Sequence, residues 1–179
     1  MTMQRMELLA PAGGMEQLKA ALRFGADAVY GGLSRHSLRA FAGNFDAAAL
    51  SEVVRLCHAQ GARFYAAINA LATDGELSDF VDTAREALEA GVDAAIVADV
   101  GVAAELRRQV PGLALHLSTQ LSVLNAPAAE ALRAVTGATR VVLAREMRLE
   151  DVAALRRALS PDMALEAFVH GAMCMSVSG

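Results

Sequence analysis

Short apolar runs alternate with longer amphipathic stretches along the chain. The apolar runs are roughly four to seven residues long, end at glycine or polar residues, and are typical of buried strands. The longer stretches place apolar residues three or four positions apart, as one face of a helix does. The predicted strands cover residues 6–10, 27–30, 63–69, 93–98, 113–118, 140–144 and 163–169, and the predicted helices cover 15–24, 47–60, 77–88, 102–110, 126–136 and 149–159.

Four of the predicted helix-to-strand joints have the same pattern, a glycine followed by one small or apolar residue and then the strand. They are Gly25-Ala-Asp27, Gly61-Ala-Arg63, Gly91-Val-Asp93 and Gly137-Ala-Thr139. A glycine that ends a helix and leads directly into a strand predicts compact, repeated strand–helix units. Strict alternation of such units favours a parallel sheet joined by right-handed crossovers.

The pattern predicts an α/β protein with a (β/α)8 TIM-barrel-like fold. A complete barrel needs about 250 residues, and the chain has 179. We therefore expect residues 1–179 to form a single, incomplete domain, truncated to about seven strands and six helices. A doubly wound open sheet is the alternative fold, although neither a G-x-G-x-x-G fingerprint nor a P-loop is present.

Polar residues gather where the predicted strands end. In a barrel, the carboxyl ends of all strands meet at one face, and that face carries ligands and chemistry. The residues that we expect to line a substrate pocket there are Asn69, Gln120, Arg145, Glu146, Glu166 and His170. The alternative is that such residues only solvate the starts of loops.

Two of the carboxylates lie within predicted strands. Glu7 precedes Leu8 and Leu9, and Glu166 lies in the middle of the last apolar run. A buried carboxylate needs a partner or a raised pKa, because an unpaired charge is costly in an apolar interior. Structural hydrogen bonds in the barrel interior are the other interpretation of both residues.

Composition removes several function classes. The formal net charge is −4, which gives no basic surface for nucleic acid within this chain. The two cysteines form no disulfide framework, so a reducing cytoplasm is expected, and no apolar run is long enough to cross a membrane. Lys19, the only lysine, falls within a predicted helix, which excludes a Schiff-base mechanism at a strand end. H-E-x-x-H and G-x-S-x-G patterns are also absent.

The last stretch carries a dense motif that begins in the final predicted strand. It is Glu166-x-Phe168-x-x-Gly171-Ala-x-Cys174, followed by Ser176-x-Ser178-Gly179. Further motifs are Glu7-Leu-Leu-Ala-Pro-Ala-Gly13-Gly14, Tyr30-Gly-Gly, Ser118-Thr-Gln120 and Ala144-Arg-Glu146. These motifs resemble those of the U32 peptidases, also called collagenase-like proteases, and follow the family's order along essentially the whole chain.

The resemblance implies an enzyme whose full-length form carries a 4Fe-4S cluster, with Cys174 as one ligand. Such a cluster needs about four thiolates, and the remaining family cysteines would lie beyond Gly179. Cys57 shares a helical face with Leu50, Val53 and Val54 and is interpreted as a core residue. The chain by itself is therefore expected to bind no cluster and to be inactive.

The resemblance also implies hydroxylation of pyrimidines in tRNA or rRNA, with prephenate as the hydroxyl source. RNA would be bound through regions beyond this chain. A peptidase acting on collagen-like chains and a non-catalytic scaffold or partner-binding module remain alternatives. A small-anion site is expected near Arg145 and His170.

A barrel without its eighth strand leaves the first and the seventh strand unpaired. Unpaired strand edges expose backbone donors and acceptors, which favours pairing with another chain. We expect these edges to form a homodimer or to be bridged by residues 171–179 folding back.

Overall fold

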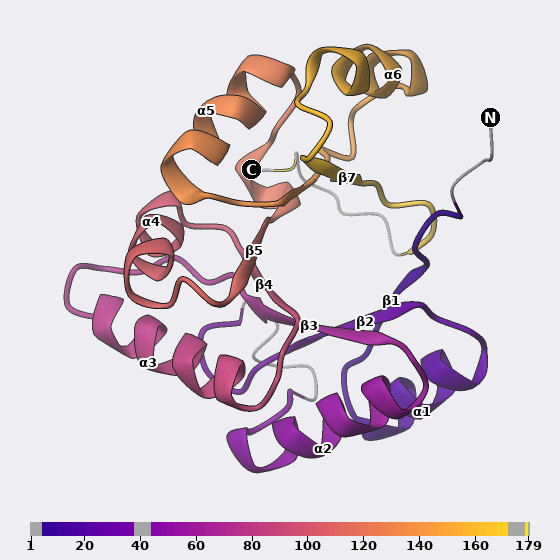
Figure 1. Ribbon diagram of the computed structural model, residues 1–179, viewed down its shortest axis with the longest axis vertical. Coiled ribbons are helices and arrows are strands. Elements are labelled where there is room, and N and C mark those ends of the chain that lie inside the picture. Colours follow the sequence, from indigo (N-terminus) through magenta and orange to yellow (C-terminus); the bar gives the residue numbers. More distant parts are fainter. Residues whose placement is uncertain (1–4, 38–43, 172–177, 179) are drawn as a thin grey trace.

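The computed structural model of the protein describes residues 5–37, 44–171 and 178. Its strands form one parallel sheet in which every strand lies beside the next one in the chain, in the order β1 to β7. Figure 1 shows the strands curving around a ring, with β1 and β7 at its two ends. The strands are β1 (Leu9–Pro11), β2 (Ala28–Gly32), β3 (Arg63–Ile68), β4 (Ala94–Val97), β5 (Ala114–Leu117), β6 (Arg140–Val142) and β7 (Ala164–Glu166).

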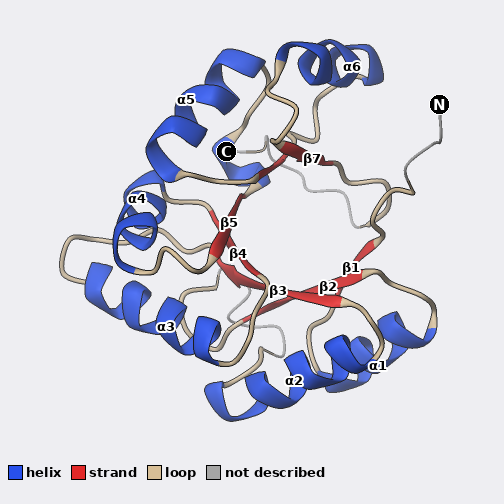
Figure 2. Ribbon diagram, in the orientation of Figure 1, coloured by secondary structure: helices blue, strands red, loops and turns tan. Residues whose placement is uncertain are grey.

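One helix lies between each pair of successive strands, and the helices cover the outside of the ring (Figure 2). They are α1 (Met15–Arg23), α2 (Ala47–Ala59), α3 (Leu77–Glu89), α4 (Val100–Gln109), α5 (Ala126–Thr136) and α6 (Leu149–Ala158), and a short 3-10 helix, η1 (Thr119–Leu121), follows β5. The TIM-barrel-like prediction is confirmed. The doubly wound alternative is wrong, because that fold requires a reversal of strand order that this sheet lacks.

Helix ends follow the predicted local chemistry. The glycines of the four repeated joints all have positive φ, between 68° and 87°: Gly25, Gly61, Gly91 and Gly137. Glycine adopts this left-handed conformation without the steric cost that a Cβ brings. At the other ends, Asp46 accepts a hydrogen bond from the Ala49 amide at 2.7 Å, and Asn125 accepts one from Ala128 at 2.9 Å.

Two apolar layers pack against the sheet. The larger layer lies between the strands and the helices and contains Cys57, which is fully buried. Burial raises the pKa of the Cys57 thiol to about 11, which agrees with its interpretation as a core residue. The smaller layer lies on the inner side of the sheet and consists of Ala28, Tyr65, Ala94 and Ile96.

The first and last strands differ from their predicted ranges. The apolar run 6–10 predicted a buried strand, but β1 begins at Leu9, and Met6 and Leu8 are 89% and 52% exposed. The run 163–169 yields only three strand residues, and Phe168 and Val169 are 50% and 89% exposed. Among the described residues, β1 pairs only with β2 and β7 only with β6. Each of these strands has a neighbour on one side only in the described part of the chain. The prediction from apolar content alone therefore made both strands too long.

Within residues 5–37, 44–171 and 178, no helix has both the length and the apolar character that crossing a membrane requires.

Candidate functional site

At the carboxyl ends of the strands, two predicted site residues meet. Asn69 follows β3 and Gln120 lies in η1, and the Asn69 Nδ2 donates to Gln120 Oε1 at 3.0 Å. The Ser118 hydroxyl donates to the same oxygen at 3.1 Å. Parallel pairing places the ends of β3 and β5 on one face although 51 residues separate Asn69 from Gln120. The result is a partly buried amide pair with a fixed orientation.

A second polar group forms around Ser178. The backbone amide and the Nε of Arg145 each donate to Ser178 Oγ at 3.1 Å, and the Ser178 amide donates to Glu146 Oε1 at 2.6 Å. Ser122 donates from its hydroxyl to the Ser178 carbonyl oxygen. Amide hydrogen bonds from its own backbone and from Ser178 lower the pKa of Glu146. Arg145 and Glu146 thus share one fully buried serine, Ser178.

Sequence reasoning named neither Ser122 nor Ser178 as a site residue. Ser178 does occur within the quoted motifs, and that position was the available signal. Ser122 has no such signal. It stands out only in the structure, where it adopts a left-handed conformation with φ of 49° at the end of η1.

The remaining predicted residues do not join these two groups. His170 is exposed and makes no hydrogen bond with another described residue. Cys174, the expected cluster ligand, lies outside the described residues. The structure therefore brings together Asn69 with Gln120, and Arg145 with Glu146, but it does not bring His170 to either pair.

Glu166 lies apart from the carboxyl-end groups, in the barrel interior. Its Oε2 accepts a hydrogen bond from Arg140 Nη1 at 3.1 Å, and the same nitrogen donates to Glu7 Oε1 at 2.7 Å. Tyr65 donates its hydroxyl proton to Glu7 at 3.0 Å. Arg63 approaches Glu7 at 3.3 Å, close to where these strands begin. We call Glu7, Arg63, Tyr65, Arg140 and Glu166 the interior ion cluster.

Burial and charge oppose one another in this cluster. Burial raises the pKa of Glu166, and the neighbouring Arg140 offsets only part of that effect. Burial also works against the charge of Arg140, but hydrogen bonds from the guanidinium to Glu7 and Glu166 outweigh it, so the pKa of Arg140 is raised. Arg140 therefore remains charged between two carboxylates.

The described residues offer no metal-binding group. No cluster of three or more His, Cys, Asp or Glu side chains is placed to hold a metal ion in this part of the chain. The Cys57 thiol is buried behind the sheet and has a raised pKa, which makes it a poor thiolate donor. The described residues thus do not fit an iron–sulfur cluster by themselves.

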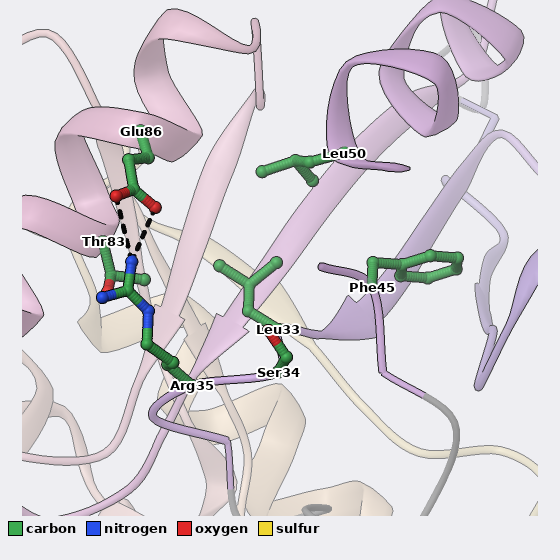
Figure 3. Close-up of a pocket in the computed structure, with 7 residues that line it drawn as sticks. All are labelled: Leu33, Ser34, Arg35, Phe45, Leu50, Thr83 and Glu86. Atoms are coloured by element: carbon green, nitrogen blue, oxygen red, sulfur yellow. Dashed lines mark hydrogen bonds and ion pairs between the residues drawn. The ribbon is translucent and has the colours of Figure 1, made fainter. Parts of the chain in front are cut away.

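A small cavity lies beside β2 and between α2 and α3 (Figure 3). It is lined by Leu33, Ser34, Arg35, Phe45, Leu50, Thr83 and Glu86 and has a volume of about 30 Å³. The Arg35 guanidinium contacts both Glu86 oxygens, at 2.8 and 2.9 Å. The volume of this cavity is that of roughly one water molecule. The cavity is therefore not a substrate pocket.

A parallel sheet of seven strands, six outer helices and polar groups at the strand carboxyl ends define a TIM-barrel-like protein. The family model described as peptidase family U32 matches residues 13–179. The chain belongs to peptidase family U32.

Three relatives illustrate the range of the family. The chain is 38% identical over 173 residues to tRNA hydroxylation protein P of Escherichia coli, which covers 97% of the chain and 38% of the relative. It is 36% identical over 175 residues to the 23S rRNA 5-hydroxycytidine C2501 synthase of the same organism, covering 98% of the chain and 26% of the relative. It is 35% identical over 190 residues to a collagenase of Porphyromonas gingivalis, and the match covers 100% of the chain and 45% of the relative.

A solved structure of the U32 peptidase Mk0906 has the same fold, with a TM-score of 0.71 at 16% identity, covering 91% of this chain and 68% of that one. The chain spans less than half the length of the three curated relatives described above.

Proposed function

We propose that the chain forms the barrel part of an enzyme that hydroxylates pyrimidines in tRNA or rRNA. The observation that carries the proposal is sequence identity to tRNA hydroxylation protein P that extends over 97% of the chain. The rRNA synthase, at 36% identity over 98% of the chain, supports the same reaction class.

The two carboxyl-end groups suit this role. The Asn69–Gln120 pair presents amide groups held in one orientation, as recognition of a base edge or of a small polar co-substrate requires. The Arg145 guanidinium, anchored through Nε by Ser178, supplies positive charge for a carboxylate such as those of prephenate. These residues would bind and orient the reactants, and none of them supplies redox chemistry.

The redox step requires a cofactor, and an iron–sulfur cluster would supply one-electron chemistry. We propose Cys174 as one ligand, with the other thiolates outside the residues described by the structure. RNA binding would also rely on other regions, because the formal net charge of this chain is −4 and RNA binding depends on positive surface.

The proposal is tested by deleting the gene and measuring hydroxylated pyrimidines in tRNA and rRNA by mass spectrometry. Loss of one such nucleoside, restored by the full gene, is expected. A gene that carries Gln120→Ala should restore at least about tenfold less of the hydroxylated nucleoside than the full gene, because the amide pair is lost. Gln109→Ala is the matched control, since Gln109 lies on α4 and bonds to Arg85. Unchanged RNA in the deletion strain would contradict the proposal, as would full-length protein purified without oxygen that contains no iron.

A collagen-directed peptidase is the second candidate, favoured by 35% identity to the collagenase. The serines of the two carboxyl-end groups, however, do not bond to a histidine in the described part of the chain. Ser118 bonds to Gln120, Ser178 to Arg145, and His58 pairs with Asp93. The described polar groups at the carboxyl ends of the strands therefore do not form a nucleophile–base pair of the usual kind. Gelatin cleavage by the purified protein, together with unchanged RNA in the deletion strain, would favour the peptidase.

A further inference from the structure

A second cavity opens at the amino-terminal ends of the strands, opposite the face of the proposed function. Its volume is about 300 Å³, which is at the lower end of the range for small-molecule sites. The residues that line it are Arg63, Tyr65, Asp93, Ala114, His116, Thr139, Arg140 and Ala164. The space is too large for one ordered water and large enough for a small metabolite.

Two buried nitrogen atoms of residues lining this cavity have no hydrogen-bond partner in the described part of the chain. They are Nδ1 of His116 and Nε of Arg140. The His116 residue is 5% exposed, and its ring meets the Tyr65 ring edge-on, with 4.7 Å between the centroids. The Arg140 guanidinium lies over the same tyrosine ring at 5.2 Å. Buried polar groups of native proteins are normally satisfied, so this pair indicates a missing partner.

The wall of the cavity is rich in donors. Arg63 and Arg140 line it, whereas Glu7 and Glu166, which occupy Nη1 of Arg140, do not. The one carboxylate in the lining is Asp93, and its Oδ2 already accepts from the Phe64 amide and pairs with His58. Burial and the two nearby arginines lower the pKa of His116 to about 3, so the imidazole is neutral at pH 7 and carries one N–H. What the cavity lacks is an acceptor.

We propose that the amino-terminal mouth of the barrel binds a small oxyanion, a carboxylate or a phosphate. Arg63, whose side chain is 60% exposed, donates from the part of its guanidinium that Glu7 leaves unused. Arg140 Nε and His116 Nδ1 have almost no accessible surface, so both side chains turn toward the cavity when the anion binds, and each nitrogen then donates to it. Two guanidinium groups and an imidazole N–H match the several acceptor oxygens of such an anion. The site is separate from the carboxyl-end face and does not depend on the reaction proposed there.

The test titrates the purified full-length protein with inorganic phosphate and, separately, with malonate, and follows the imidazole nitrogens of His116 by NMR. Saturable shifts are expected, and the tighter of the two anions identifies the ligand class. Arg63→Met, followed by the His116 shifts, and His116→Phe, followed by isothermal titration calorimetry, should each weaken binding at least about tenfold, because each removes a charge-assisted or buried hydrogen bond. Arg63 is 60% exposed at its side chain, so its replacement should leave the fold intact.

Arg148→Met is the matched control, because it removes an exposed guanidinium that does not line the cavity. It should leave the His116 shifts and the affinity unchanged. The proposal is overturned if His116 does not shift at about 50 mM of either anion, far above a millimolar dissociation constant. It is equally overturned if both site variants bind like the unmodified protein, or if only Arg148→Met loses binding.

Discussion

At the scale of single residues, Arg140 is a mostly buried charge held between two carboxylates. It joins carboxylates from the two ends of the described chain, Glu7 before β1 and Glu166 in β7. The side chains of Arg140, Glu7 and Glu166 are only 13%, 24% and 18% exposed. Charges so far removed from water are tolerable only while they are paired.

Replacing Arg140 with methionine should therefore lower the free energy of unfolding by about 3–5 kcal/mol, because the partly buried Glu166 loses its charge partner and Glu7 loses one of two. Urea denaturation followed by circular dichroism measures the change. Arg148→Met is the control, since Arg148 makes an exposed pair with Asp151 whose loss should leave the free energy of unfolding nearly unchanged. Equal effects of the two substitutions would show that the interior ion cluster does not stabilise the fold.

His116 should make stability depend on pH. Its pKa in the folded protein is about 3, below the ordinary value of 6.5, so the unfolded chain binds more protons between these values. The His116 contribution is fully present above pH 6.5 and is lost as the pH falls toward 3, with a slope of up to about 1.4 kcal/mol per pH unit.

His116→Phe should flatten this dependence, because phenylalanine has no proton to bind. Urea denaturation at pH 5 and pH 6.5 measures the free energy of unfolding of both proteins. Both pH values lie above the ordinary pKa of most carboxyl groups, so carboxylates contribute little to the difference. His58→Phe serves as a control at an exposed histidine. A pH dependence that is the same in His116→Phe and in the unmodified protein would refute the assignment.

At the scale of elements, side-chain caps and neighbouring helices fix the helix ends. Asn125 caps α5 at its start, and Arg107 from α4 donates to the carbonyls of Ala134 and Val135 at its end, at 2.6 and 3.1 Å. These bonds satisfy backbone groups that have no partner inside the helix. Helix α5 thus depends on both its own sequence and its neighbour.

Asn125→Ala should lower the free energy of unfolding by about 1 kcal/mol, since the Ala128 amide loses its acceptor. Thermal and urea denaturation measure the effect. Asn125→Ser is the matched variant and should retain most of the stability, because serine also caps helices well. If alanine and serine were equally destabilising, a role other than capping would be responsible.

At the scale of the whole molecule, the sheet is open between β1 and β7 within the described residues. Apolar side chains are exposed beside this opening, among them Met6, Leu8, Phe168 and Val169. Ser178, the one described residue of the last eight, is held by Arg145, Glu146 and Ser122 near the ends of β6 and η1. Exposed apolar groups beside unpaired strand edges favour association.

We expect the purified chain to self-associate through this opening. Light scattering over a range of concentrations should detect the dimer, and Leu8→Lys should weaken it at least about tenfold by placing a charge in the apolar contact. Leu149→Lys is the control, because Leu149 is 88% exposed at the start of α6. A monomer at all concentrations would show the expectation to be wrong.

The order and type of the elements could be predicted from the sequence because they depend on local patterns. Helical spacing, strand-length apolar runs and the glycines that end helices act within a few residues of one another. The same locality made the ends of the barrel hard to predict. The runs 6–10 and 163–169 are apolar, but only part of each forms a strand. A strand also needs neighbouring strands to pair with, and the local sequence pattern does not show whether they are present.

The candidate site was only partly predictable for the same reason. Asn69 and Gln120 could be placed on one face, since parallel strands bring their carboxyl ends together. For Glu166 the sequence left the pocket and the barrel interior open, and the residue lies in the interior ion cluster, because side chains alternate along a strand and the sheet register turns this one inward.

The sequence by itself determined which residues form strands and helices and in which order. Only the tertiary structure decided that Arg140 would meet Glu7, 133 residues away, and that His116 would face the interior with an unpartnered nitrogen. Contacts between distant strands depend on the curvature and register of the whole sheet, and no local pattern encodes either.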